Sequence, residues 1–331
     1  MRIIIDVMSG DRAPAELLRG AAMAAEEYST DIAVVGDENV IREIALENDI
    51  PLGGLDIVHA ASVIGMEDKP LSVIRDKSDS SMSVALRLLE KGEGDALVSA
   101  GNTGALLAGA TLLVRRIKGI RRAAIATVLP FPSPVLLMDS GANLTVTPED
   151  MEQFAFMGSI YMEKLHGLKG ARIGLLNNGT EYNKGLPLQV ETFTRLEDND
   201  LLYFIGNVEA KDIPFSACDV LLTDGFTGNI VLKYTEGMGK FMMDTMKRMF
   251  MANPATQVAA LAMRRQLKNM KKQFDASEYG GAPLLGISKP VIKAHGSSDA
   301  KAIKNAVLQS IAFISTGVNQ EFAKLGAAYQ E

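Results

Sequence analysis

The sequence predicts an α/β protein in which helices cover a parallel or mixed sheet. Short β-branched runs, Gly-rich turns and helical periodicity alternate from Ile3 to the C-terminus, as in chains that build such a sheet. Of 331 residues, 47% are hydrophobic and 22% are charged, so the chain can pack a large core. No low-complexity or Ser/Gly linker divides it. We therefore expect one continuous α/β unit over residues 1–331, with two lobes and a cleft as an alternative.

The expected strands are short apolar runs bounded by turn residues. They lie near residues 2–5, 32–35, 55–58, 95–99, 123–128, 135–138, 172–176, 201–205, 219–223 and 290–294. Between most of them, apolar residues recur with helical spacing. The expected helices lie near residues 14–28, 38–47, 72–91, 104–116, 148–166, 187–196, 228–251, 255–274 and 299–325. The longest apolar stretch, Gly101 to Val114, is shorter than the roughly 18 to 20 residues that span a bilayer, so a buried helix is expected there.

Charge and cysteine content exclude several classes of protein. Lys and Arg number 34 and Asp and Glu number 40, and the net charge of −6 would repel a nucleic-acid backbone, so no nucleic-acid partner is expected. The single cysteine, Cys218, cannot form an internal disulfide or a thiolate metal cage, which favours a reducing cytosol. The first residues, Met1 to Asp6, meet a charge too early for a signal peptide. We expect a cytoplasmic protein.

One local pattern, D-x-L-x-[ST]-x-G-x-T-G, occurs at Asp95 to Gly104 and again at Asp219 to Gly228. Each copy is expected to form a strand, a tight turn and the start of a helix. Helix N-termini at the carboxyl ends of strands present free N–H groups and suit phosphate. The candidate phosphate- or substrate-binding residues are Ser99, Gly101, Asn102, Thr103, Gly104, Asp224, Gly225, Thr227 and Gly228. In the alternative interpretation, the glycines only permit tight turns and Thr103 and Thr227 only cap helices.

Further turns of this kind follow other expected strands. They are Asp6 to Pro14, Asp139 to Asn143, Asn177 to Gly185 and His295 to Asp299. They add the candidate binding residues Asp6, Gly10, Asp11, Asp139, Asn143, Ser297 and Ser298. Lys184 could reach a ligand oxygen as a mobile point charge, or it could be merely solvated. Ser297 and Ser298 could bind phosphate oxygens while capping a helix, or could only cap it.

Few residues are available for nucleophilic or metal chemistry. Of the three histidines, His166 is expected to have a structural role at a helix end, and His59 a role in a turn, whereas His295 precedes Gly-Ser-Ser and is a candidate for substrate contact. Cys218 is expected to be a small buried thiol. Metal motifs and nucleotide-binding fingerprints are absent, so we expect neither metal nor cofactor. A divalent ion would require Asp6, Asp11, Asp139 and Asp224 to converge.

Residues 245–274 are basic and contain no acidic residue. Apolar residues from Ala259 to Phe274 fall on one side of the expected helix 255–274, and basic residues fall on the other. Pro254 should break this helix from the preceding one, which predicts a protruding helical hairpin over 236–275. Its candidate membrane or partner residues are Met249, Phe250, Val258, Leu261, Arg264, Arg265 and Lys268. Anionic lipid, an acidic partner protein, a dimer contact and core packing of the Met stripe all remain open.

Several motifs, in this order and spacing, resemble the bacterial phosphate acyltransferases of phospholipid synthesis over nearly the whole chain. They are DVMSGDRAP, SSMSVALRLL, DALVSAGNTGALLAG, DSGAN, NNGTEYNKG, GNVEAKDI, DVLLTDGFTGNIVLK, EYGGAPLLGI and HGSSD. The resemblance implies an isocitrate/isopropylmalate dehydrogenase-like fold, related to phosphotransacetylases. It also implies a homodimer bound peripherally to the inner face of the cell membrane, near the membrane glycerol-3-phosphate acyltransferase. The chain departs from the family pattern at Ser9, Arg12 and Thr180 to Tyr182.

The resemblance implies that such enzymes make acyl phosphate from acyl-acyl carrier protein and inorganic phosphate. Phosphate is a competent nucleophile and a thiolate is a good leaving group, so the protein needs chiefly to hold them together and stabilise the oxyanion. We therefore expect direct attack by phosphate, with Lys184, His295 and Asn229 as the catalytic residues. Two alternatives remain: an NAD-dependent dehydrogenase of the same fold, and a non-catalytic membrane scaffold for lipid enzymes.

Overall fold

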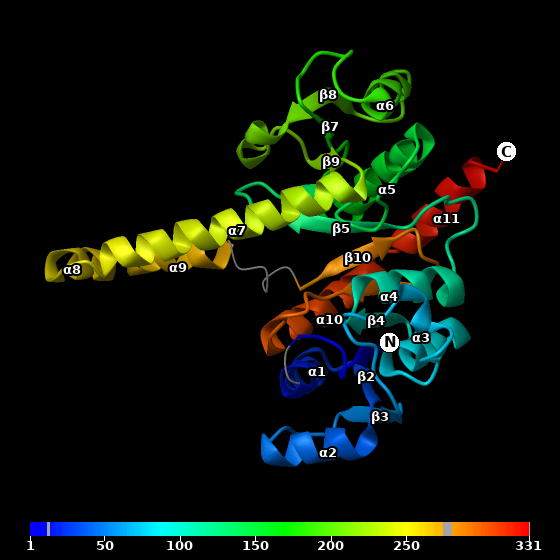
Figure 1. Ribbon diagram of the computed structural model, residues 1–331, viewed down its shortest axis with the longest axis vertical. Helices are drawn as coiled ribbons and strands as arrows, with labels where there is room; N and C mark the ends of the chain where they lie inside the picture. Colours follow the sequence, from blue (N-terminus) through cyan, green and yellow to red (C-terminus); the bar gives the residue numbers. More distant parts are fainter. Residues whose placement is uncertain (12–13, 274–279, 331) are drawn as a thin grey trace.

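The computed structural model describes residues 1–11, 14–273 and 280–330. It contains one eleven-stranded sheet in the order β3-β2-β1-β4-β11-β10-β5-β6-β9-β7-β8, with helices packed against it (Figure 1). The predicted α/β class with a mixed sheet is therefore confirmed.

The strands are β1 (Arg2–Asp6), β2 (Asp31–Gly36), β3 (Leu55–His59), β4 (Ala96–Ser99), β5 (Ala124–Leu129), β6 (Val135–Met138), β7 (Ile173–Asn177), β8 (Phe204–Glu209), β9 (Val220–Leu222), β10 (Ala282–Leu285) and β11 (Val291–Lys293). The α-helices are α1 (Pro14–Tyr28), α2 (Glu38–Glu47), α3 (Ser81–Lys91), α4 (Thr103–Gly109), α5 (Pro148–His166), α6 (Pro187–Glu197), α7 (Gly225–Phe250), α8 (Pro254–Ala262), α9 (Arg264–Gln273), α10 (Ala300–Ser315) and α11 (Val318–Ala328). Short helical turns are η1 (Pro70–Val73), the π-helical η2 (Ala110–Val114) and η3 (Ala210–Phe215).

The N-terminal part of the sheet is buried on both faces. β1 pairs in parallel with β2 and β4, and β11 pairs in parallel with β4. Successive side chains of a strand point to opposite faces. Ile3 and Ile5 pack in the core cluster that includes α1 and α10, whereas Ile4 packs in the cluster that includes α3 and α4. This explains why the first strand is a continuous apolar run instead of an alternating one.

Strand direction reverses across the centre of the sheet. β10 is antiparallel to both β11 and β5, and β5 is antiparallel to β6. β6, β9, β7 and β8 then run parallel to one another. The carboxyl ends of the parallel strands therefore form two groups, one from β1, β4 and β11 and the other from β6, β9 and β7. Catalytic loops of α/β proteins lie at such strand ends.

Several predicted elements need correction. The strand placed near 201–205 is β8, shifted to 204–209, and β10 was not predicted. The helix placed at 72–91 is the turn η1 followed by α3, which begins only after the Ser80 cap. The helix placed at 299–325 is two helices, because Gly317 adopts a left-handed φ of 70° between them.

The helix predicted over 255–274 is also two helices. α8 ends and α9 begins around Met263, whose ψ of 9° is not helical, although its N–H still bonds the Ala259 carbonyl. No feature of the surrounding sequence explains this break. Phe274 lies outside the described residues. No residue of α8 is buried. For that helix, the interpretation that its apolar side packs in the core is therefore wrong.

The repeated sequence pattern corresponds to a repeated structure. Asp95 accepts the backbone N–H of Arg2 at 2.8 Å, and its own N–H bonds the Arg2 carbonyl at 2.8 Å. Asp219 makes the same two bonds to Arg172, also at 2.8 Å each. The first aspartate of each copy therefore fixes the start of a neighbouring parallel strand, β1 in one half and β7 in the other.

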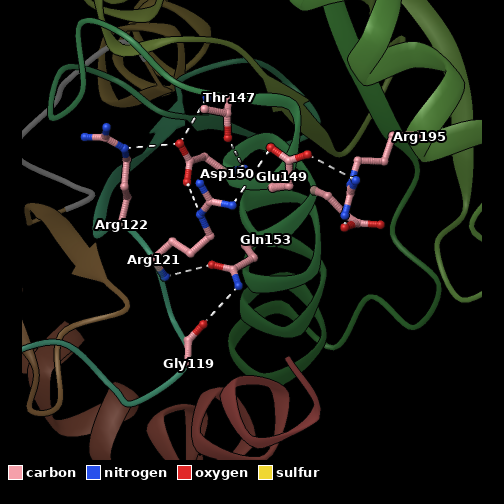
Figure 2. A network of polar contacts seen from close by, with 9 residues as sticks. Gly119, Arg121, Arg122, Thr147, Glu149, Asp150, Gln153 and Arg195 are labelled. Carbon is pink, nitrogen blue, oxygen red and sulfur yellow. Dashed lines mark hydrogen bonds and ion pairs between the residues drawn. The ribbon is translucent and has the colours of Figure 1, made fainter. Parts of the chain in front are cut away.

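A polar network fastens the segment before β5 to the start of α5 (Figure 2). The Asp150 side chain is 1% exposed and forms ion pairs with Arg121 Nε at 3.2 Å and Arg122 Nε at 3.1 Å. Asp150 also completes a capping box with Thr147. Gln153 accepts the Arg121 N–H at 2.9 Å and donates to the Gly119 carbonyl at 3.0 Å. The network holds the segment between η2 and β5 against α5.

Replacing Asp150 with alanine should lower the free energy of unfolding by about 2–3 kcal/mol, because it removes a cap and the partner of two arginines. The arginines are half exposed and can be rehydrated, which limits the loss. The midpoint of urea unfolding measures it. Glu163→Ala, an exposed acid of the same helix, should change stability by less than about 0.5 kcal/mol. Equal midpoints for the two variants would contradict the prediction.

Candidate active site

The carboxyl ends of β1, β4 and β11 carry a row of polar residues. Asp6 pairs in register with Ser99, and Ser99 pairs in register with Lys293. The Ser99 hydroxyl donates to Asp6 Oδ2 at 2.8 Å, and Asp6 Oδ1 accepts the Met8 N–H at 3.3 Å. Two of the predicted site residues, Asp6 and Ser99, are therefore in direct contact although 93 residues separate them in sequence.

The three loops that follow these strands pack against one another and define the first part of the candidate site, here called the N-terminal cluster (6–11, 99–104 and 293–298). Asp11 N–H donates to the Gly296 carbonyl at 2.9 Å. A Cβ on Gly10 would lie 3.3 Å from that carbonyl, and a Cβ on Gly101 would lie 2.7 Å from the Ser9 Cβ. The glycines permit the close approach of the loops. Arg12, a departure from the family pattern, lies outside the described residues.

Asn102 is the N-cap of α4, so the interpretation of Thr103 as the cap is wrong. Its Oδ1 accepts the Ala105 N–H at 3.0 Å, and its Nδ2 donates to the Met66 carbonyl at 2.8 Å. Both the oxygen and the nitrogen of the Asn102 side-chain amide are therefore used in structural hydrogen bonds. Thr103 is exposed, and Gly104 lies against Pro70.

The last loop of the N-terminal cluster presents His295, Ser297 and Ser298. His295 Nδ1 accepts the Ser297 N–H at 3.2 Å and lies 2.8 Å from the Ser297 hydroxyl. Because a backbone N–H can only donate, a neutral His295 carries its proton on Nε2, where it can donate to an oxyanion. The Ser298 side chain is buried, and its hydroxyl has no hydrogen-bond partner in the described part of the chain. Both groups could bind phosphate oxygens.

The carboxyl end of β6 carries Asp139, which is completely buried. Its Oδ1 accepts the N–H groups of Ile125, Gly141 and Ala142 at 2.9–3.1 Å. Its Oδ2 accepts the backbone and side-chain amides of Asn143 at 2.7 and 2.8 Å. Burial raises the pKa of Asp139, while the four hydrogen bonds from Gly141, Ala142 and Asn143 act in the opposite direction. Asp139 and Asn143 therefore shape their own loop, and their oxygens and amide are engaged within it.

The carboxyl end of β9 leads directly into α7. Asp224 caps α7 by accepting the Thr227 N–H at 2.9 Å and hydroxyl at 2.7 Å, so it is Asp224 and not Thr227 that is the N-cap. Gly225 N–H donates to the Asn143 carbonyl at 2.7 Å. Gly228 packs against Asp139, where a Cβ would lie 1.9 Å from the carbonyl oxygen. These contacts join the loops after β6 and β9 into a C-terminal cluster (139–143 and 224–229).

Asn229 follows on the first turn of α7. A Cβ on Gly141 would lie 3.4 Å from Asn229 Nδ2, so the amide covers the loop after β6. Within the described residues, no hydrogen bond engages this amide. Asn229 is the member of the C-terminal cluster whose side chain is available to a ligand.

Lys184 lies on the loop after β7. Its N–H donates to the Glu181 carbonyl at 3.1 Å, its carbonyl accepts from Asn177 Nδ2 at 3.0 Å, and its Nζ lies 3.8 Å from Glu181 Oε1. The side chain is 50% exposed. Because β7 is parallel to β9 and β9 to β6, Lys184 lies at the same sheet edge as the C-terminal cluster.

The two clusters border the same hydrophobic core. Ala142, in the loop after β6, packs against the core cluster that contains Ala105 and Leu106 of α4. Ile125 belongs to that same core, and its N–H bonds Asp139. The four predicted acids Asp6, Asp11, Asp139 and Asp224 do not converge, since within the described ranges no three or more His, Cys, Asp or Glu residues are grouped as metal ligands would be.

Cys218 and the two remaining histidines, His59 and His166, have structural roles. Burial raises the pKa of Cys218 to about 12, which leaves its thiol protonated and unreactive. His59 accepts the Glu38 N–H at 3.3 Å beside the start of α2. His166 ends α5 as predicted, its ring packs near Tyr161, and desolvation lowers its pKa.

A hollow of about 630 Å³ lies elsewhere, beside α5 and α6, and is lined by Glu152, Val190, Glu191, Thr194, Arg195, Asp198, Asn199 and Asp200. None of these residues follows the carboxyl end of a strand in either cluster. We therefore place the candidate site at the two loop clusters and not in this hollow.

Sequence analysis missed Lys293, the third residue of the polar row. Burial lowers its pKa to about 8, and Nζ donates to the carbonyls of Ala100, at 3.2 Å, and Ala294. A signal was present, because a lysine directly follows the apolar run Val291-Ile292 and precedes the His-Gly-Ser-Ser turn. A charge at the end of a buried strand requires a partner or a function.

The fold of the chain is similar to that of phosphotransacetylases. A phosphotransacetylase from Streptococcus pyogenes superposes with a TM-score of 0.61 at 16% identity, covering 97% of this chain and 94% of that one. A 4-hydroxythreonine-4-phosphate dehydrogenase from Klebsiella pneumoniae superposes with a TM-score of 0.54 at 14% identity, covering 94% and 97%. Both similarities concern the fold.

Sequence comparison then identifies the family. The family model described as fatty acid synthesis protein matches residues 1–321. A phosphate acyltransferase of Clostridioides difficile is 43% identical over 333 residues, which cover 100% of this chain and 98% of the relative. The chain belongs to the fatty acid synthesis protein family, and the predicted membership in the family of phosphate acyltransferases is confirmed. The expected enzyme class, acyltransferase, is the class that the relatives' name describes.

Proposed function

We propose that the protein transfers a fatty acyl group from acyl-acyl carrier protein to inorganic phosphate, giving acyl phosphate for phospholipid synthesis. Full-length similarity to phosphate acyltransferases is the observation that carries the proposal. The site agrees with it, because the strand ends offer N–H, hydroxyl and ammonium groups, as a reaction between phosphate and a thioester requires. No cofactor takes part in the proposed reaction.

In the proposed reaction, a phosphate oxygen attacks the thioester carbonyl, the C–O bond forms and the C–S bond breaks. The leaving thiolate takes up a proton that the phosphate gives up, so the products are acyl phosphate and the free carrier thiol. Lys184, His295 Nε2 and the Asn229 amide stabilise the oxyanion that develops on the carbonyl oxygen. Direct attack needs no acyl-enzyme, in keeping with the buried and protonated Cys218.

The test is thiol release from a long-chain acyl carrier protein thioester with and without inorganic phosphate, with hydroxylamine to trap acyl phosphate. Phosphate-dependent release with a matching amount of acyl hydroxamate is expected. A stable acyl-enzyme, or release independent of phosphate in folded protein, would contradict the proposed mechanism.

We further propose that the far end of α7 and the adjoining α8 and α9 bind the cytoplasmic face of an anionic membrane, near the acyltransferase that uses acyl phosphate. Figure 1 shows α7 extending away from the sheet with α8 at its far end. Val258 and Leu261 are 67% and 70% exposed, and Met249 is also exposed. Phe250 is half-buried, and Arg264, Arg265 and Lys268 are exposed. Exposed apolar and cationic side chains together suit anionic lipid.

Replacing both Val258 and Leu261 with serine should reduce sedimentation with anionic vesicles at least about 10-fold. The reason is that the membrane would lose contact with two apolar side chains that are exposed in the free protein. Leu46→Ser is the control, since Leu46 is 83% exposed on α2. Binding that is unchanged in the double variant would favour a carrier-protein or dimer role for this segment.

No helix in the described residues is long and apolar enough to cross a membrane. For the homodimer that the resemblance implies, we propose the exposed apolar side of α7 as the contact. Its residues are Phe226, Ile230, Tyr234, Phe241 and Met242. A single-chain mass in equilibrium sedimentation would contradict a dimer.

A further inference from the structure

Lys293 has no role in the mechanism above, yet it ends β11 inside the N-terminal cluster. Residues paired in register on parallel strands project to the same face of a sheet. Lys293, Ser99 and Asp6 therefore form a polar row across β11, β4 and β1. The neighbouring residues of these strands, such as Ile292, Val98 and Ile5, are completely buried and apolar. Lys293 is a charged residue next to these apolar ones, and packing of the core does not require a charge there.

The Lys293 ammonium has a hydrogen-bond donor left over. Its Nζ donates to the Ala100 carbonyl at 3.2 Å and to the Ala294 carbonyl. An ammonium has three donors. No carboxylate of the described residues forms an ion pair with it. One N–H of the ammonium therefore remains for a ligand at the junction of the three loops.

Ser298 is an independent sign of a ligand at the same loops. The residue is 5% exposed, and its hydroxyl has no partner among the described residues. Its backbone is held in place, because its N–H donates to the His295 carbonyl at 3.0 Å. Buried hydroxyls are nearly always hydrogen-bonded in folded proteins. A ligand oxygen in this loop would satisfy the Ser298 hydroxyl.

The charges that face Lys293 keep it cationic near neutral pH. Burial lowers its pKa to about 8, while the carboxylates of Asp11, in the loop after β1, and Asp6, on β1, act against that shift. His295 is the nearest titratable group on its own loop. At pH 7 the protonated form of Lys293 is then about ten times as populated as the neutral amine. The positive charge is lost as the pH rises through about 8.

We propose that Lys293 is a further substrate-contacting residue: its free N–H and the Ser298 hydroxyl bind oxygens of the inorganic phosphate. Ala100 and Ala294 aim the ammonium, and the row with Ser99 and Asp6 fixes the strand ends that carry it. The assignment of phosphate as the substrate rests on the proposed function. Binding of the anion can be measured without turnover, so the two claims can be tested separately.

The experiment measures binding of inorganic phosphate to the full chain by isothermal titration, with circular dichroism to verify folding. Lys293→Met should weaken binding at least about 10-fold at pH 7, the usual loss for a hydrogen bond to a charged group. Lys293→Arg should retain binding and, unlike the wild type, should keep it above pH 8. Lys289→Met is the matched control, because Lys289 lies just before the start of β11, at the end of the strand away from the site. The Lys289→Met variant should bind phosphate with the affinity of the wild type.

Wild-type affinity in Lys293→Met would overturn the proposal. If that variant does not fold, Ser298→Ala provides the test, because it removes a hydroxyl without a partner among the described residues. Unchanged affinity in Ser298→Ala, together with an unchanged pH dependence in Lys293→Arg, would also overturn it. If the wild type makes acyl phosphate and Lys293→Met has the same KM for phosphate, only this inference fails. If phosphate binding depends on Lys293 but no acyl phosphate forms, only the proposed function fails.

Discussion

Replacing Lys184 with alanine should lower kcat for phosphate-dependent thiol release about 10²- to 10³-fold, the usual effect of losing one preorganised group that stabilises an oxyanion. The Lys184 ammonium can move to a substrate, because its Nζ lies as far as 3.8 Å from Glu181 Oε1 and both side chains are about half exposed. Exposed ion pairs of this kind are weak. Hydroxylamine trapping of acyl phosphate measures the effect.

Lys211→Ala is the matched control for Lys184. Lys211 follows β8, which neighbours β7 in parallel, and its Nζ pairs with Glu209 at 2.7 Å. It is therefore another exposed lysine at the same sheet edge, and its replacement should leave kcat unchanged. Lys184→Arg should recover part of the lost rate by restoring the charge. A wild-type kcat in Lys184→Ala would remove Lys184 from the catalytic residues.

Replacing Gly228 with alanine should lower the free energy of unfolding by about 3 kcal/mol or more, at the upper end of overpacking effects. The new Cβ would lie 1.9 Å from the Asp139 carbonyl oxygen and 2.9 Å from Thr223 Cγ2. The first of these is backbone, so either α7 or the loop after β6 must move. Activity should fall as well, because the same movement displaces Asn229. The midpoint of urea unfolding and kcat measure the two effects.

Gly237→Ala provides the control on the same helix. Nothing lies within 4 Å of a Cβ at Gly237, so the change should stabilise α7 by about 0.5–1 kcal/mol through helix propensity alone. If Gly228→Ala unfolds at the same urea concentration as Gly237→Ala, the close contact with Asp139 is not important for stability.

The comparison of the two repeated loops shows how far sequence patterns predict a site. The shared pattern predicted a strand, a turn and a helix twice, and both are present. The caps, however, are Asn102 in one copy and Asp224 in the other, because those side chains reach the free N–H groups of their helices. Equivalent Thr103 and Thr227 consequently have different surroundings: one is exposed, and the other donates to Asp224.

Long-range pairing explains what the sequence could not show about the site. Asp6, Ser99 and Lys293 form one row only because β11, from the C-terminal part of the chain, pairs beside β4. Strand order and register depend on contacts between distant segments, which local periodicity does not contain. The same limit applies to Asp139, whose buried carboxylate is engaged by its own loop and by Ile125 of β5.

The sequence by itself determined the α/β class, most strands and helices, and the loops that carry the candidate site, because apolar periodicity, turn residues and repeated motifs are local properties. Only the tertiary structure decided which loops meet, which carboxylates accept hydrogen bonds from their own loops, and that the half-buried Lys293 at the end of β11 lies beside Ser99 and Asp6. These features depend on strand pairing and burial, which set the partners and the pKa of a side chain through contacts between segments that are distant in sequence.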